Sequence, residues 1–62
     1  MLEDIQIVLT RVGKAKITGV TQKGYAWIKE NMTKESPIVV DADAVPELEK
    51  ILEKDGLTVL SR

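Results

Sequence analysis

Four positively charged side chains lie close together in the first part of the sequence: Arg11, Lys14, Lys16 and Lys23. Lysine and arginine bind the phosphates of nucleic acids, so these residues are candidate nucleic-acid contacts. The sequence shows no helix-turn-helix, zinc-finger or aromatic RNA-binding pattern beside them. A solvated basic surface is therefore the simpler interpretation, and nucleic-acid binding is kept as an alternative.

Two aromatic residues, Tyr25 and Trp27, are the only ones in the chain. Exposed aromatic side chains anchor protein interfaces or stack on bases, so both residues are candidate interface residues. In a chain without phenylalanine, however, Trp27 is well suited to fill the space between a helix and a sheet. Core packing is the favoured interpretation for Trp27.

The polar residues offer little catalytic chemistry. Asp41 and Asp43 could share a divalent cation after a predicted strand, but helix capping explains them more simply and no calcium-loop spacing surrounds them. Ser36 and Ser61 lack a histidine base, because the chain contains neither histidine nor cysteine. We therefore predict a non-enzymatic protein without a metal or cofactor.

Residues 43–60 predict an amphipathic helix, a glycine stop and a strand. Asp43 is the expected N-cap, Pro46 suits the first turn, and Gly56 can adopt the left-handed conformation that ends a helix. Residues 57–60 then have the apolar, β-branched character of a strand. The residues that recur at spacings of three and four, and so form the apolar stripe of the helix, are Val45, Leu48, Ile51 and Leu52.

Residues 4–10 and 15–20 predict the two strands of a hairpin that turns at residues 12–14. A helical stripe also fits the first of these segments, but its density of β-branched residues favours a strand. Pro37 then precedes the apolar run 38–40, which is typical of a strand that is covered or central in a sheet.

Residues 22–32 predict a helix, with Thr21 as its N-cap. Tyr25, Ile28 and Met32 share one face of this helix. Gly24 either marks the close approach of another backbone or a ligand, or is simply tolerated in the first turn, and the second interpretation is the simpler one.

The element order ββαβαβ predicts an α+β two-layer sandwich, one domain spanning residues 1–62. Right-handed crossovers place both helices on one face of a small mixed sheet. The uncovered sheet face or an edge strand is then a candidate surface for dimerisation or partner binding.

The charges are distributed unevenly. Residues 1–34 contain six Lys and Arg against three Asp and Glu, whereas residues 35–62 contain three against seven, giving +3 and −4. Such asymmetry could orient a partner, although the two halves interleave in a compact domain. No run of about 20 apolar residues is present, so we expect a cytoplasmic protein.

The sequence resembles small uncharacterised open reading frames of phages and mobile elements. The resemblance spans about residues 17–60 and implies no activity. The residues that carry it are Thr21-x-Lys23-Gly24-x-x-Trp27-Ile28-x-Glu30-Asn31, Val45-x-x-Leu48 and Asp55-Gly56-Leu57.

Small size and the lack of catalytic patterns favour a protein-binding adaptor or modulator, of phage or mobile-element type. A nucleic-acid-binding accessory that uses the basic hairpin is the first alternative. A homodimeric structural module, in which the sheet continues between subunits, is the second.

Overall fold

The computed structural model describes residues 2–61, which form a four-stranded sheet, two α-helices and a short 3₁₀ helix. The helix predicted at residues 22–32 has those bounds, and each predicted strand is present with its ends shifted by a residue or two. The elements in chain order are β1 (Ile5–Arg11), β2 (Lys14–Gly19), α1 (Gln22–Met32), β3 (Ile38–Asp41), η1 (Ala42–Ala44), α2 (Val45–Lys54) and β4 (Val59–Ser61).

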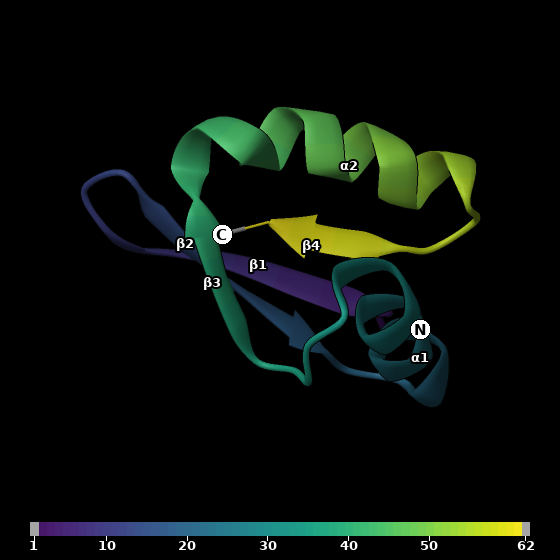
Figure 1. Cartoon of the computed structure of the whole chain (residues 1–62). Helices are drawn as coiled ribbons and strands as arrows, with labels where there is room; N and C mark the ends of the chain where they lie inside the picture. Colours follow the sequence, from purple (N-terminus) through teal and green to yellow (C-terminus); the bar gives the residue numbers. More distant parts are fainter. Residues whose placement is uncertain (1, 62) are drawn as a thin grey trace.

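The strands lie side by side in the order β3-β2-β1-β4 (Figure 1). β2 is antiparallel to both β1 and β3, whereas β4 is parallel to β1. The sheet is therefore mixed, and α2 carries the chain from one edge of the sheet across to the other. The predicted ββαβαβ order and α+β class are confirmed.

The two faces of the sheet differ because side chains alternate along each strand. Ile7, Ile17 and Ile38 form one row across three strands and are buried under the helices. The next residues along, Lys16 and Val39, point to the other side. We call this other side the open face; its residues are Gln6, Val8, Lys16, Thr18, Val39 and Leu60.

Side chains from both helices pack on the first face of the sheet. Trp27 and Ile28 of α1 join the same apolar cluster as Val45 and Leu52 of α2. The sheet contributes Ile5, Ile7, Ala15, Ile17 and Ile38, and Leu57 completes the core. Both helices therefore cover one face, as predicted.

β3 is an edge strand, so the prediction of a covered or central strand is wrong. Its apolar run points alternately to both sides, and Val39 on the open face is 62% exposed. The error has a physical cause: three consecutive apolar residues cannot distinguish a strand buried on both faces from one that leaves a valine in water.

The buried side of α1 includes only part of the face that Tyr25, Ile28 and Met32 share. Gly24, Trp27 and Ile28 are its buried residues, whereas Tyr25 is 51% exposed and Met32 is only partly buried. The core side of the helix is thus turned toward Gly24, which can approach the sheet more closely than tyrosine. Trp27 is buried, as favoured above, and its Nε1 donates to Asp55 Oδ2 at 2.8 Å.

The helix ends confirm two of three predicted caps. Thr21 accepts a hydrogen bond from the Gly24 amide at 3.2 Å, and Gly56 has a φ of 81° after α2. Asp43 is not the N-cap of α2, because it lies inside the 3₁₀ turn that precedes the helix. Ala44 occupies the cap position without a side-chain hydrogen bond.

Asp4 connects three parts of the chain just before β1. Its carboxylate accepts from the Thr21 hydroxyl at 2.7 Å and from the Thr58 amide at 3.0 Å. Its backbone carbonyl accepts from Val20 N at 2.8 Å, and its amide donates to Thr58 O at 2.9 Å. Asp4 therefore joins the start of β1, the N-cap of α1 and the segment leading into β4.

Gly24 lies directly against this connection. A Cβ atom at residue 24 would overlap the Asp4 carbonyl oxygen and come within 2.8 Å of its carbonyl carbon. Both of these atoms belong to the backbone and cannot move aside as a flexible side chain would. The close-approach interpretation of Gly24 is therefore the right one, although the residue also lies in the first helical turn.

Gly24→Ala should destabilise the protein, contrary to the usual benefit of alanine in a helix. Separating α1 from the start of β1 should lower the free energy of unfolding by about 1–3 kcal/mol, the usual cost of overpacking. Urea denaturation followed by tryptophan fluorescence measures the change. Ala26→Gly is the control and should cost only about 0.5–1 kcal/mol through helix propensity. A more stable Gly24→Ala variant would contradict the described contact.

The Asp4 contacts should also make stability depend on pH. The hydrogen bond from the Thr58 amide, and then that from the Thr21 hydroxyl, hold the pKa of Asp4 below its ordinary value, against a smaller effect of burial. A carboxyl group with a lowered pKa stabilises the fold above its unfolded pKa, and that contribution is lost as the pH falls through the folded pKa.

The free energy of unfolding should therefore fall below about pH 4, and Asp4→Asn should remove much of this dependence. Urea denaturation over a series of pH values measures both effects. Asp41→Asn is the control. The pKa of Asp41 is also lowered, by a hydrogen bond and charge interaction with Lys14, but both partners of that pair are largely exposed. Equal pH dependence in Asp4→Asn and the wild-type protein would contradict the role given to Asp4.

Candidate functional site

An apolar groove opens between the C-terminal end of α1, strand β3 and helix α2. Its volume is about 180 Å³. Five of its six lining residues are apolar and one is charged. The residues that line it are Met32, Val40, Ala44, Glu47, Leu48 and Ile51. We call this hollow the groove.

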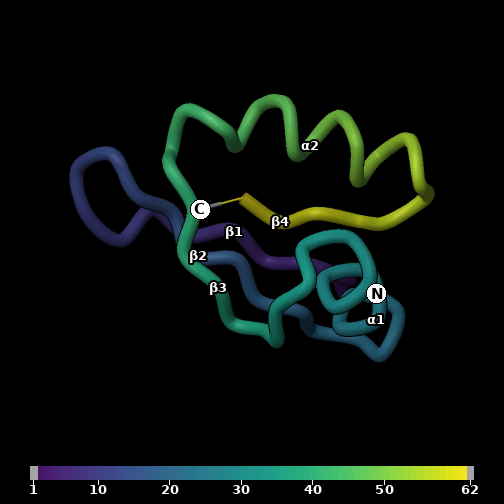
Figure 2. The backbone as a smooth tube through the Cα atoms, viewed as in Figure 1, coloured from purple at the N-terminus to yellow at the C-terminus, as the bar shows by residue number. Residues whose placement is uncertain are grey.

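The groove exists because the two helices diverge. Figure 1 and Figure 2 show α2 from the side and α1 nearly end-on, so the two axes cross at a wide angle. α1 ends at Met32, and beyond it the chain turns back into β3 through a short connection. Val40, on the helix side of β3, is only partly buried.

Some apolar side chains in the walls of the groove pack against the core, and one is largely exposed to water. Met32, Val40 and Leu48 are partly buried and pack against the core. Ile51 lies one helical turn after Leu48 and is 44% exposed. Its neighbour Leu52 is fully buried, so Ile51 is the edge of the apolar stripe of α2 and not its centre. Water contacts an apolar surface here that a partner could cover.

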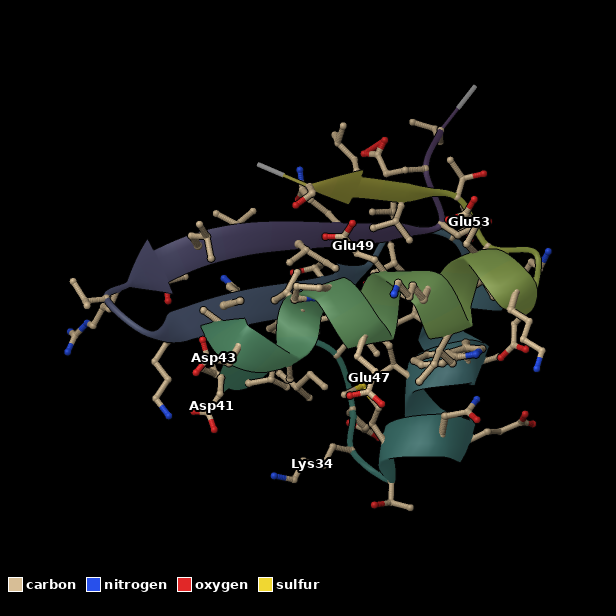
Figure 3. The ribbon with its side chains drawn as sticks, turned by 90° about the horizontal axis from the view of Figure 1, so that it is seen from above. Lys34, Asp41, Asp43, Glu47, Glu49 and Glu53 are labelled. Atoms are coloured by element: carbon tan, nitrogen blue, oxygen red, sulfur yellow. The ribbon has the colours of Figure 1, made fainter. Side chains whose placement is uncertain are left out.

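Glu47 places a single carboxylate in the groove wall. Figure 3 shows its side chain on the flank of α2 that faces α1 and Lys34. Glu49 and Glu53 lie on the opposite flank, beside β4, where they line a separate hollow of about 250 Å³. The two flanks of α2 are thus chemically different: the groove is mainly apolar, and the hollow near β4 is bordered by carboxylates.

The basic hairpin holds three of the four predicted nucleic-acid contacts. Arg11 and Lys14 lie beside the turn, and Lys16 belongs to the open face. Lys14 Nζ lies 2.6 Å from Asp41 Oδ1, which ties the hairpin to the end of β3. Lys23 is separate, because α1 begins after the other end of β2, and its Nζ donates to the carbonyl of Gly56 at 2.9 Å.

The two predicted interface aromatics also have different surroundings. Trp27 is 9% exposed and belongs to the core, so it presents little surface to a partner. Tyr25 is exposed and lines a hollow of about 190 Å³ with Lys29, Glu35 and Ser36. Ser36 Oγ accepts a hydrogen bond from Gly19 N at 2.8 Å, which gives this serine a structural contact.

The two carboxylates that follow β3 have different surroundings. Asp41 binds Lys14, and Asp43 lies in η1 at the N-terminal end of α2 (Figure 3). Within residues 2–61, no three acidic side chains are grouped as metal ligands.

The groove was not identified from the sequence. Four of its residues, Met32, Val40, Leu48 and Ile51, come from three elements whose relative placement no local pattern reveals. One signal was present: Ile51 widens the apolar stripe of α2 beyond the centre marked by Val45, Leu48 and Leu52. An apolar residue at the edge of a stripe is a candidate for partner contact.

Comparisons of the chain with protein-family models, with curated proteins and with solved structures found no match. Among the helices of residues 2–61, none combines the length and apolar character needed to cross a membrane.

Proposed function

We propose that this protein is a non-enzymatic, cytoplasmic adaptor or modulator that binds another protein through the groove. The observation that carries the proposal is Ile51, a large apolar side chain held 44% exposed at the edge of an apolar hollow. Complete burial of a fully exposed isoleucine contributes about 1.5–3 kcal/mol. Covering the 44% of Ile51 that is still exposed would therefore contribute about 0.7–1.3 kcal/mol to a protein interface.

The size of the groove favours a protein partner over a small molecule. Sites for small molecules usually enclose about 300–1,000 Å³ and bury most of the ligand. The groove measures about 180 Å³ and is open. A hollow of this kind accommodates one or two apolar side chains of a partner, whose remaining contacts spread over the surrounding surface.

A light-activated cross-linking residue in place of Ile51 should capture a protein in the cells where this chain occurs. The reason is that Ile51 would lie inside the interface. The measurement is the mass of the adduct after nuclease treatment. The same residue in place of Glu53, on the other flank of α2, is the matched control and should give little of that adduct. Equal capture at both positions would count against groove-directed binding.

Nucleic-acid binding by the hairpin is the second candidate function. The observation in its favour is that Arg11, Lys14 and Lys16 lie on one hairpin. Two contacts oppose it, since Lys14 is paired with Asp41 and Lys23 with the Gly56 carbonyl. A phosphate would have to compete with Asp41 for Lys14.

Short duplex DNA should therefore cause only weak amide shifts, confined to residues 11–16 and reversed by salt. Such shifts would reflect non-specific phosphate contact, whose affinity falls steeply as the salt concentration rises. NMR titration of labelled protein at two salt concentrations measures them. Strong binding that also shifts residues around Lys23 would favour the nucleic-acid function over the proposed one.

The homodimeric module and the phage or mobile-element origin stay predictions. For the dimer, both edges of the sheet are short: β3 has four residues and β4 has three. Short edge strands offer few backbone groups to a second sheet. This geometry makes continuation of the sheet between subunits the less favourable mode of association.

A further inference from the structure

We propose that the segment that binds in the groove is cationic, with a bulky apolar side chain next to a lysine or arginine. The inference rests on the proposed function and adds the chemistry of the partner. Two properties of the groove carry it: its lining is apolar except for Glu47, and this carboxylate forms no ion pair within residues 2–61.

Covering the groove would remove water from the Glu47 carboxylate. A buried charge without a partner is strongly unfavourable, whereas a charge that gains a hydrogen-bonded counter-ion is tolerated. An acidic segment would displace this water and add a like charge, and an uncharged segment could replace some of the hydrogen bonds but would supply no counter-charge. A lysine or arginine beside the apolar anchor replaces them, and arginine can do so with two parallel hydrogen bonds.

The chain has cations of its own near the groove. Lys34 follows α1 and lies on the same side of α2 as Glu47 (Figure 3). Lys50 comes three positions after Glu47 in the sequence of α2. Neither forms an ion pair with Glu47. Both are exposed, so either could pair with Glu47 only by giving up its freedom in water. The carboxylate is thus available to a partner.

A second carboxylate, that of Asp43, indicates on which side of its apolar anchor the partner should carry its positive charges. Asp43 is exposed at the N-terminal end of α2, about one helical turn before Glu47 (Figure 3). Asp41 lies close by but is already paired with Lys14. A segment with its apolar side chain against Ile51 would meet Glu47 first and Asp43 beyond it. Two cations on one side of the anchor would match this arrangement.

The test is a selection from random peptides displayed on phage, with the chain of residues 1–62 as the target. Peptides that also bind an Ile51→Ser variant are discarded, which retains those that use the groove. Ile51 is partly exposed, so this variant should fold, and its amide NMR spectrum verifies that it does. Synthetic copies of the enriched peptides are then titrated into the wild-type protein and two charge variants.

Enriched peptides should carry an excess of lysine and arginine next to a large apolar residue. Glu47→Gln should weaken their binding about three- to tenfold, the range between exposed and partly buried charge pairs. Glu53→Gln is the matched control, because it removes a carboxylate from the other flank of the same helix. Affinity for that variant should be unchanged, and added salt should weaken binding to the wild-type protein more than to Glu47→Gln.

Groove-dependent peptides without excess positive charge, bound equally well by Glu47→Gln, would overturn the cationic inference and leave groove binding intact. A failure to enrich any peptide that depends on Ile51 would overturn both. A second copy of the protein is the other possible occupant of the groove, and sedimentation equilibrium of the protein alone tests for it. A mass that rises with concentration in the wild-type protein but not in Ile51→Ser would show a second copy in the groove and overturn the cationic partner.

Discussion

The contact between the Asp4 carbonyl and Gly24 is the constraint on which the rest of the structure depends. It brings the first turn of α1 against the start of β1, and the hydrogen bonds of the Asp4 carboxylate hold Thr21 and Thr58 at the same point. With the beginning of α1 held there, the helix meets the sheet through Trp27 and Ile28, and Tyr25 is left outside. Gly24 thus sets the rotation of α1 about its axis. The hydrogen bonds of the Asp4 backbone and carboxylate hold the helix in that orientation.

The groove is a consequence of covering four strands with two short helices. α1 is held at the Asp4 end of the sheet and ends at Met32, whereas α2 crosses from β3 to β4. Because the helices diverge (Figure 1), the surface between Met32, Val40 and α2 is only partly filled. A small domain buries a limited share of its surface, and exposed apolar residues such as Ile51 are expected in it. What distinguishes Ile51 is its position beside a hollow with one carboxylate.

Local patterns in the sequence were sufficient for the elements and for the fold class. Thr21 and Gly56 mark helix ends through their own backbone chemistry, and the hairpin and α1 follow from periodicity and turn residues. The predictions failed where the structure depends on more than the pattern of a single segment. Asp43 has the side chain of an N-cap, but the chain leaves β3 through a 3₁₀ turn and α2 begins later. Gly24 and Asp4 are separated by twenty positions, and neither residue reveals the other. The groove likewise requires three elements placed in space, so only the extra breadth of the α2 stripe at Ile51 pointed to it.

The parallel pairing of β1 with β4 has a consequence for how the protein is made. β1 is central in the sheet, yet one of its two neighbours is β4, which is synthesised after the other three strands. Thr58 donates to Asp4 across 54 positions of sequence, and the Asp4 and Ile5 amides donate back to the Thr58 carbonyl. Contacts of such long range carry a large loop-closure cost that only the assembled sheet offsets. During synthesis the hairpin and α1 leave the ribosome first, and β1 lacks its pairing with β4 until residues 58–61 have left the exit tunnel. Completion of the fold is thereby tied to completion of this part of the chain.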